Sequence, residues 1–183
     1  TVWPGHGIGV NTSHQFVEGE YMKAEEYDHF LDDQADFNFR ILIPRMYGLF
    51  ASLAQLPPLG SMYMFLPLDL FGTPEFSAML QTLASIGRET IEWNRQVEEL
   101  FDALRAHGFP GRVAMAGGGV PYDMISDFMR GMRGAMLDMY RRPDKLLAAI
   151  EKISAQTLAS IAAAPKAEGF TTSFIALHRG ADG

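Results

Sequence analysis

The chain has 183 residues, of which 48% are hydrophobic and 20% charged, with a formal net charge of −7. Such a composition is that of an ordinary globular protein, and the length suits one domain with a substantial core. The 15 basic residues are scattered among 22 acidic ones, which excludes the clustered cationic surface that nucleic-acid binding requires.

Cysteine is absent, which excludes disulfides, thiol nucleophiles and thiolate metal ligands within this chain. No apolar run approaches the ~18 residues needed to span a bilayer, so we expect no membrane partner and a cytoplasmic location. The chain begins without Met and stops at Gly183, just after a strand-like run. These ends suggest a piece of a longer protein.

Hydrophobic periodicity and capping residues predict several helices. A helix from Asp36 to Leu56 should be kinked at Pro44. A long helix should begin at Thr73-Pro74 and end at Gly108, with Gly87 as a point of division and a solvated, charged outer face. The remaining predicted helices cover 23–33, one continuous stripe from Asp123 to Tyr140, and a segment starting at Asp144.

Three β-rich segments, at 14–21, 112–116 and 171–177, alternate with these helices. Strands separated by helical crossovers are typical of a parallel α/β sheet. Three strands are too few to close a barrel of about eight. The pattern therefore predicts an α/β fold of which the chain supplies only a part.

The segment after the last predicted strand concentrates polar chemistry in His178, Arg179 and Asp182. Ligands bind at the carboxyl ends of parallel strands. There an imidazole can transfer a proton, a guanidinium can bind a carboxylate, and a carboxylate can orient either group. The alternative is a solvated polar turn.

A second candidate site lies at the end of the first predicted strand. Glu18 and Glu20 would share one face because strand side chains alternate, and Tyr21 follows them. Two carboxylates on one face can divide the roles of acid and base. The alternative is the solvated face of an edge strand.

A third candidate is the glycine-rich loop that contains Gly118 and Gly119 and leads to Tyr122. Glycines let a backbone approach a ligand closely, although the spacing is not that of a nucleotide-binding motif. The alternative is a flexible turn. The histidines show no metal-ligand spacing, so no metal residue is predicted.

Four stretches, taken in order, resemble the uroporphyrinogen decarboxylase superfamily, and closest its divergent, decarboxylase-like branch. They are Gln-Phe-Val-Glu-Gly-Glu-Tyr-Met at 15–22, Pro-Arg-Met-Tyr-Gly at 44–48, Arg-Gly-Met-Arg-Gly-Ala-Met-Leu-Asp-Met-Tyr-Arg-Arg-Pro-Asp-Lys-Leu at 130–146 and His-Arg-Gly-Ala-Asp-Gly at 178–183. The resemblance implies a TIM-type (β/α)8 barrel, with residues 1–183 as one domain forming roughly its first half.

The resemblance also implies a carboxy-lyase that acts on a tetrapyrrole without a cofactor. Arginines would bind the substrate carboxylates, and an Asp would hold the pyrrole N–H groups and stabilise the protonated ring. We assign catalytic roles to His178, Asp182, Glu18 and Glu20. We assign substrate binding to Tyr122, Arg179, Gly118, Gly119 and Tyr21. The family's Gly-Ala-Pro-Trp-Thr stretch is matched loosely at 119–123, and Asp127 stands where the family has a Tyr.

Two further functions stay open at this point. The superfamily includes zinc-dependent methyltransferases that move a methyl group between a corrinoid protein and a thiol, in which case zinc would be bound outside this chain. A non-catalytic tetrapyrrole- or corrinoid-binding protein is the other alternative. The expected partner is a small molecule, and a homodimer formed through the Met- and aromatic-rich segment 62–71 is compatible with the pattern, as is a covered core loop.

Overall fold

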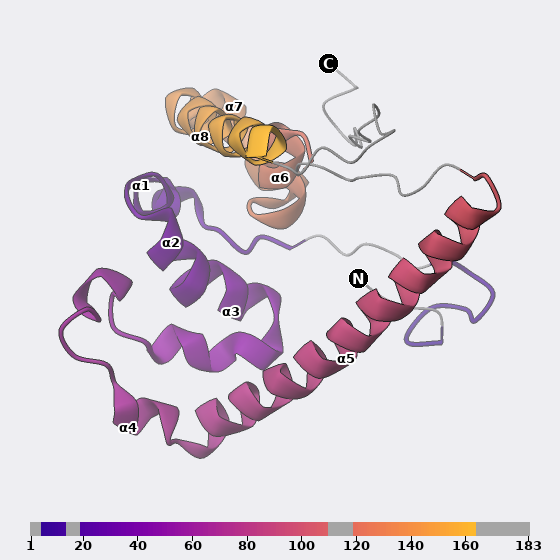
Figure 1. The fold of residues 1–183 in the computed structure, drawn as a ribbon. Helices are drawn as coiled ribbons and strands as arrows, with labels where there is room; N and C mark the ends of the chain where they lie inside the picture. Colours follow the sequence, from indigo (N-terminus) through magenta and orange to yellow (C-terminus); the bar gives the residue numbers. More distant parts are fainter. Residues whose placement is uncertain (1–4, 14–18, 110–118, 164–183) are drawn as a thin grey trace.

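The computed structural model describes residues 5–13, 19–109 and 119–163, and its regular elements are all helical (Figure 1). In chain order they are η1 (Ala24–Glu26), α1 (Tyr27–Asp32), α2 (Gln34–Phe37), η2 (Asn38–Leu42), α3 (Ile43–Met46), η3 (Gly48–Gln55), η4 (Leu59–Ser61), α4 (Leu68–Phe71), α5 (Pro74–Ala106), α6 (Pro121–Phe128), α7 (Gly131–Arg141) and α8 (Pro143–Ala163).

The prediction of an α/β, TIM-type barrel is wrong, because the described residues form helices without a strand, sheet or barrel. The predicted strands at 112–116 and 171–177 lie outside the described residues, and so does most of 14–21. At the end of that segment, the N–H groups of Tyr21 and Met22 both donate to the Met129 carbonyl, each at 2.8 Å. That carbonyl ends helix α6 and needs a donor from outside the helix, so this segment pairs with a helix end.

The main core lies between the first helices and the last. Tyr27 and Phe30 of α1 and Phe37 of α2 are at most 2% exposed, and they pack with Ile125 of α6. Phe30 and Phe37 meet edge to face with ring centroids 5.8 Å apart. The buried members contributed by α8 are Leu146, Ala149 and Ile153.

The kink predicted at Pro44 takes the form of a π-helical segment, η2, just before it. Proline removes one backbone donor and crowds the carbonyl four residues earlier, and a widened turn relieves that crowding. The predicted cap at Asp36 is wrong by one turn. Asp33 caps α2 by accepting a hydrogen bond from the Asp36 N–H at 3.0 Å, while Asp36 itself is buried.

Helix α5 begins at Pro74 as predicted and ends before Gly108, whose φ of +80° stops the helix. Gly87 does not divide it. Only its first turns are buried, where Phe76 and Met79 pack with Leu56 in a second apolar cluster. Its outer face carries exposed ion pairs within the helix, such as Arg95 with Glu92 at 2.6 Å.

The segment 62–71 packs at its two ends, through Met62, Leu70 and Phe71, against this second cluster. Its middle is not a covered core loop. The exposed apolar side chains there are Tyr63, Met64, Phe65, Leu66 and Leu68.

The single stripe predicted from Asp123 to Tyr140 is two helices, α6 and α7. Gly131 separates them with a φ of +67°, a left-handed conformation that favours glycine. The break changes which face of the second helix points inward. Gly134, Ala135 and Asp138 are the buried side of α7, and the methionines expected in the core are about half exposed, at 48–52%: Met132, Met136 and Met139.

Among the described residues, α8 is long and apolar enough to cross a membrane by length and composition, with a mean hydropathy of 1.2 in its most apolar window. A core helix of a soluble protein passes the same test. Since α8 buries Leu146, Ala149 and Ile153 against the core, packing already accounts for part of its apolar character. The expectation of a chain outside the membrane stays a prediction.

Replacing Phe37 by Ala should remove a fully buried ring and leave a cavity, lowering the free energy of unfolding by about 3–5 kcal/mol. The matched control is Phe39→Ala, two residues along, where the ring is 50% exposed. Urea denaturation followed by circular dichroism measures both. Equal losses in the two variants would contradict the assignment of the core.

Candidate functional site

The most heavily bonded polar side chain in the described residues is Arg130, which lies between α6 and α7 and is 3% exposed. Its Nε donates to Asp138 Oδ2 at 2.6 Å and its Nη2 to Asp138 Oδ1 at 3.3 Å. This bidentate geometry is the strongest form of the arginine–carboxylate pair. Asp138 is 1% exposed, so both charges are removed from water together.

The remaining guanidinium nitrogen of Arg130 reaches a second part of the chain. Its Nη1 donates to the Met22 carbonyl at 2.6 Å and also to the carboxylate of Glu20. Glu20 remains 58% exposed on its side chain, against 4% for Arg130. The pair therefore connects a buried cation to a carboxylate that solvent can reach.

Two glycines make room for this arrangement. A Cβ at Gly134 would lie 3.1 Å from the Arg130 guanidinium carbon, so α7 packs directly over the arginine. A Cβ at Gly131 would lie 3.7 Å from the Gly19 carbonyl oxygen and 3.8 Å from the Glu20 nitrogen. The loop between α6 and α7 thus closes onto residues 19–22.

Tyr27 adds a third element by donating its hydroxyl to Asp138 Oδ2 at 3.0 Å. Burial raises the pKa of Tyr27 above its usual value, and the negative charge of Asp138 raises it further. Burial alone would lower the pKa of Arg130, but its bonds to Asp138 and Glu20 outweigh burial and raise it. Tyr27 is therefore held neutral and Arg130 charged.

Arg45, in α3, ties a further segment to the same backbone. Its Nη1 donates to the Tyr21 carbonyl at 2.8 Å, and its two terminal nitrogens bind the Glu26 carboxylate at 2.7 and 2.8 Å. The hydrogen bond from Arg45 lowers the pKa of Glu26, although partial burial opposes it. Two arginines from distant segments, Arg45 and Arg130, thus hold the carbonyls of Tyr21 and Met22.

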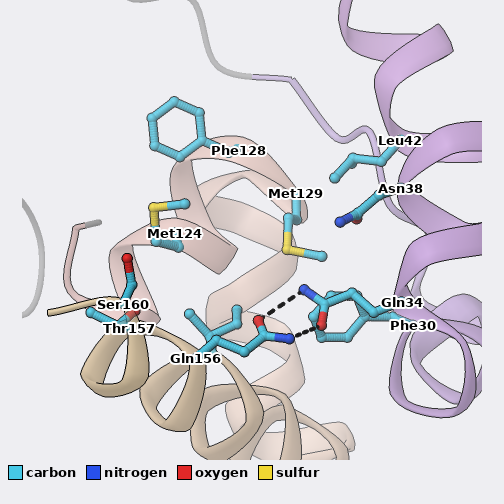
Figure 2. A pocket seen from close by; sticks show the side chains of 11 residues that line it. Phe30, Gln34, Asn38, Leu42, Met124, Phe128, Met129, Gln156, Thr157 and Ser160 are labelled. Carbon is cyan, nitrogen blue, oxygen red and sulfur yellow. Dashed lines mark hydrogen bonds between the residues drawn. The ribbon is translucent and has the colours of Figure 1, made fainter. Parts of the chain in front are cut away.

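Beside this network, an open groove of about 280 Å³ lies between α1–η2, α6 and α8 (Figure 2). Gln34 and Gln156 exchange hydrogen bonds across it, the first donating at 3.1 Å. None of the lining side chains is ionisable: Phe30, Gln34, Asn38, Leu42, Met124, Phe128, Met129, Ile153, Gln156, Thr157 and Ser160. The groove suits an uncharged, partly apolar group rather than a carboxylate.

A separate polar cluster centres on Asp36, which is 4% exposed. Its carboxylate accepts hydrogen bonds at 2.8 Å from His29 Nε2, Arg40 Nη1 and the Leu59 N–H. Burial raises the pKa of Asp36, but the bonds from Leu59, His29 and Arg40 outweigh it, so the pKa lies below its usual value. The cluster anchors the turn at Leu59 onto the first helices.

The structure describes four of the nine predicted site residues: Glu20, Tyr21, Gly119 and Tyr122. Glu20 and Tyr21 lie at the arginine network. Tyr122 lies elsewhere, on α6, with its hydroxyl 3.7 Å from the Met139 sulfur, and Gly119 precedes it beside Met124. Those outside the described residues are Glu18, Gly118, His178, Arg179 and Asp182.

Asp123 and Asp127, one turn apart on α6, are both buried, at 5% and 7% exposed. Ser126 lies between them, fully buried, and donates to Asp127 Oδ1 at 3.2 Å. Asp123 is therefore not the helix cap expected from the sequence, since α6 begins at Pro121 after Val120. Within the described residues, no group of three or more ionisable ligands is placed to hold a metal ion.

Sequence reasoning missed Arg130, Asp138 and the Asp36 cluster. One signal was present: Arg130, Gly134 and Asp138 recur every four residues, so a charged pair and a glycine share one helix face. A small residue between opposite charges on one face is typical of close packing around a buried ion pair.

No family model, curated protein or solved structure matches this chain.

Replacing Asp138 by Asn should leave Arg130 buried with only Glu20 as an ionic partner. Breaking a buried pair from one side costs about 3–5 kcal/mol of unfolding free energy. Asp102→Asn removes an ion pair of similar chemistry with Arg105 on the exposed face of α5 and should change stability little. Chemical denaturation of both variants compares them, and a small loss for Asp138→Asn would refute the buried pair.

The lowered pKa of Asp36 predicts a pH dependence of stability. A carboxyl whose pKa is depressed in the folded state contributes stability above its unfolded pKa, about 3.9, and loses that contribution as pH falls through the folded pKa. The difference in unfolding free energy between the wild type and Asp36→Asn should therefore shrink as pH is lowered from about 5 to below about 3. A difference that stays constant over this range would contradict the assignment.

Proposed function

We propose that this chain belongs to an enzyme of the uroporphyrinogen decarboxylase superfamily that acts on a tetrapyrrole, nominally as a carboxy-lyase. What supports the proposal is that two stretches carrying the resemblance, at 44–48 and 130–146, each bind residues 20–22, the described end of the stretch at 15–22. Arg45 and Arg130 hold successive carbonyls of the first stretch at 2.8 and 2.6 Å. Segments that resemble one family and also assemble around one network are expected to serve one site.

In this proposal Glu20 is the carboxylate that meets the substrate. Its side chain is 58% exposed, yet one oxygen is fixed by the buried guanidinium of Arg130. A carboxylate held in this way can accept hydrogen bonds from pyrrole N–H groups without rearranging. It would stabilise the cation that forms when the ring is protonated, before the bond between the acetate methylene and its carboxyl group breaks and CO2 leaves.

Arg130 has a positioning role in this mechanism. Because Asp138 and Glu20 already neutralise its charge, it is not free to bind a substrate carboxylate. Tyr21 adjoins Glu20, and its carbonyl is fixed by Arg45, so its ring is presented from an anchored backbone. The substrate-binding and catalytic roles of His178, Arg179 and Asp182 remain predictions from the sequence.

The test is to incubate the protein with uroporphyrinogen and to follow the loss of carboxyl groups by mass spectrometry. Glu20→Gln should lower turnover by about 100-fold, the size of effect expected when a stabilising group for a developing charge is removed. Glu25→Gln, an exposed glutamate nearby, should leave turnover unchanged. Thermal melts show whether both variants stay folded.

The groove favours a second candidate function, a non-catalytic tetrapyrrole- or corrinoid-binding protein, because its lining has no ionisable side chain to supply acid or base. Tight tetrapyrrole binding without any turnover, unaffected by Glu20→Gln, would support that candidate and refute the enzyme. Absence of both turnover and binding would refute a tetrapyrrole substrate altogether.

A further inference from the structure

Helix α5 carries exposed apolar side chains well beyond the turns that pack against the rest of the described chain. Its first turns pack against η3 and α4 through Phe76 and Met79, and Figure 1 shows the rest extending away from the other labelled helices. Beyond Leu83, large apolar side chains are exposed: Ile86 at 47%, Trp93 at 63% and Leu100 at 58%. An exposed apolar row on a long helix marks an interaction surface.

The row follows a seven-residue repeat. One series of positions, seven apart, holds Phe76, Leu83, Thr90, Val97 and Leu104, and a second series three residues later holds Met79, Ile86, Trp93 and Leu100. Apart from Thr90, both series are apolar over four repeats, a pattern typical of a helix that pairs with another helix. Phe76, Met79 and Leu83 pack within the chain, Val97 and Leu104 are partly buried, and Ile86, Trp93 and Leu100 are exposed.

We propose that two copies of this chain associate through α5 as an antiparallel helix pair with a two-fold axis between Ile91 and Glu92. In such pairs a residue of the first series faces one of the second series. This axis sets Leu83 against Leu100 of the second copy, Ile86 against Val97, and Thr90 against Trp93. Two of these layers are then apolar, and in the third the small Thr90 meets the largest side chain.

The flanking positions fit the same register. At the positions beside the row, Glu89 faces Gln96 of the second copy and Gly87 faces Asn94, so no like charges oppose each other there. The helix charges, including Arg88, Glu92, Arg95 and Asp102, lie outside the contact. A shallow hollow lined by Arg88, Glu89, Glu92, Trp93 and Gln96 lies on the same part of the helix surface.

The length of α5 also matches an antiparallel partner. Helix α5 ends at Ala106, which in this register lies opposite Ser77 of the second copy. Around Ser77 the apolar side chains Phe76 and Met79 already pack within their own chain. Each buried apolar side chain removes on the order of 100 Å² from water. The exposed Ile86, Trp93 and Leu100 give about 300 Å² per helix, to which Leu83, Thr90, Val97 and the flanking residues add, and a stable interface buries roughly 800 Å² per partner. A parallel pair would instead place Trp93 against Trp93 and Thr90 against Thr90.

The first experiment measures the mass of the wild-type chain by light scattering after size exclusion. We expect about twice the 20.3 kDa of one chain. Ile86→Glu places a charge in the contact and should raise the dimer dissociation constant by at least about 100-fold. The control is Ile91→Glu, the same substitution five residues along, on a side chain that is 72% exposed and lies outside the repeat.

Ile91→Glu should remain dimeric, and circular dichroism should show the same helix content in both variants. A monomeric wild type, a dimer that survives Ile86→Glu, or equal losses in the two variants would overturn the proposal. A complex of α5 with some other protein in place of the dimer would likewise count against it.

The second experiment tests the orientation, using the absence of cysteine in the natural chain. The double variant Gly87→Cys with Asn94→Cys should form disulfide-linked dimers on mild oxidation, because these positions face each other across the antiparallel pair. A Cβ at Gly87 meets open space, so the substitution is tolerated. Each single variant should stay unlinked, and cross-linking in the single variants would overturn the antiparallel register.

Discussion

The described fold depends on the pairing of Arg130 with Asp138. Two opposite charges, each nearly inaccessible to water, would be very costly to bury alone, and together they fix the position of every group that satisfies them. Tyr27 from α1, the Met22 carbonyl and Glu20 all bond to this pair. The N-terminal segment and the α6–α7 region, more than 100 residues apart in sequence, are therefore joined at one point.

The charges around the Arg130–Asp138 pair indicate which groups hold the structure together and which one a substrate could reach. Arg130 is neutralised on its inner side by Asp138 and on its outer side by Glu20, so its role is to hold other groups. Glu20 alone in the network keeps most of its surface in solvent. Burial thus divides the network into a fixed interior and one accessible carboxylate.

Features set by local chemistry could be predicted from the sequence. The start of α5 at Thr73-Pro74 and its end at Gly108 follow from the backbone limits of proline and glycine, and the exposed charges of α5 follow from its helical period. Glu20 and Tyr21 were selected as site residues on the assumption of a strand, and the structure brings both to the arginine network although no strand is described there.

Features set by tertiary contacts could not be predicted. The sequence predicts Asp36 as a helix cap, but its carboxylate accepts a hydrogen bond from the Leu59 N–H, 23 residues away. No local sequence pattern predicts that bond. The α6–α7 stripe reads as continuous because periodicity does not reveal that Gly131 turns left-handed. The barrel expectation failed for the same reason, since β-rich composition near Tyr21 does not specify whether the pairing partner is a strand or a helix end.

The contact between α8 and the first helices is closed by an ion pair, by the Lys152 ammonium on the Leu31 carbonyl at 2.6 Å, and by paired neutral amides. Near one end Lys145 forms an ion pair with Asp28, both about half exposed or more, whereas near the groove Gln34 and Gln156 are joined through neutral amides. Mobile ions screen the first and leave the second unaffected. Ionic strength therefore acts unequally along this contact, and the bond between the two glutamines is the part that salt weakens least.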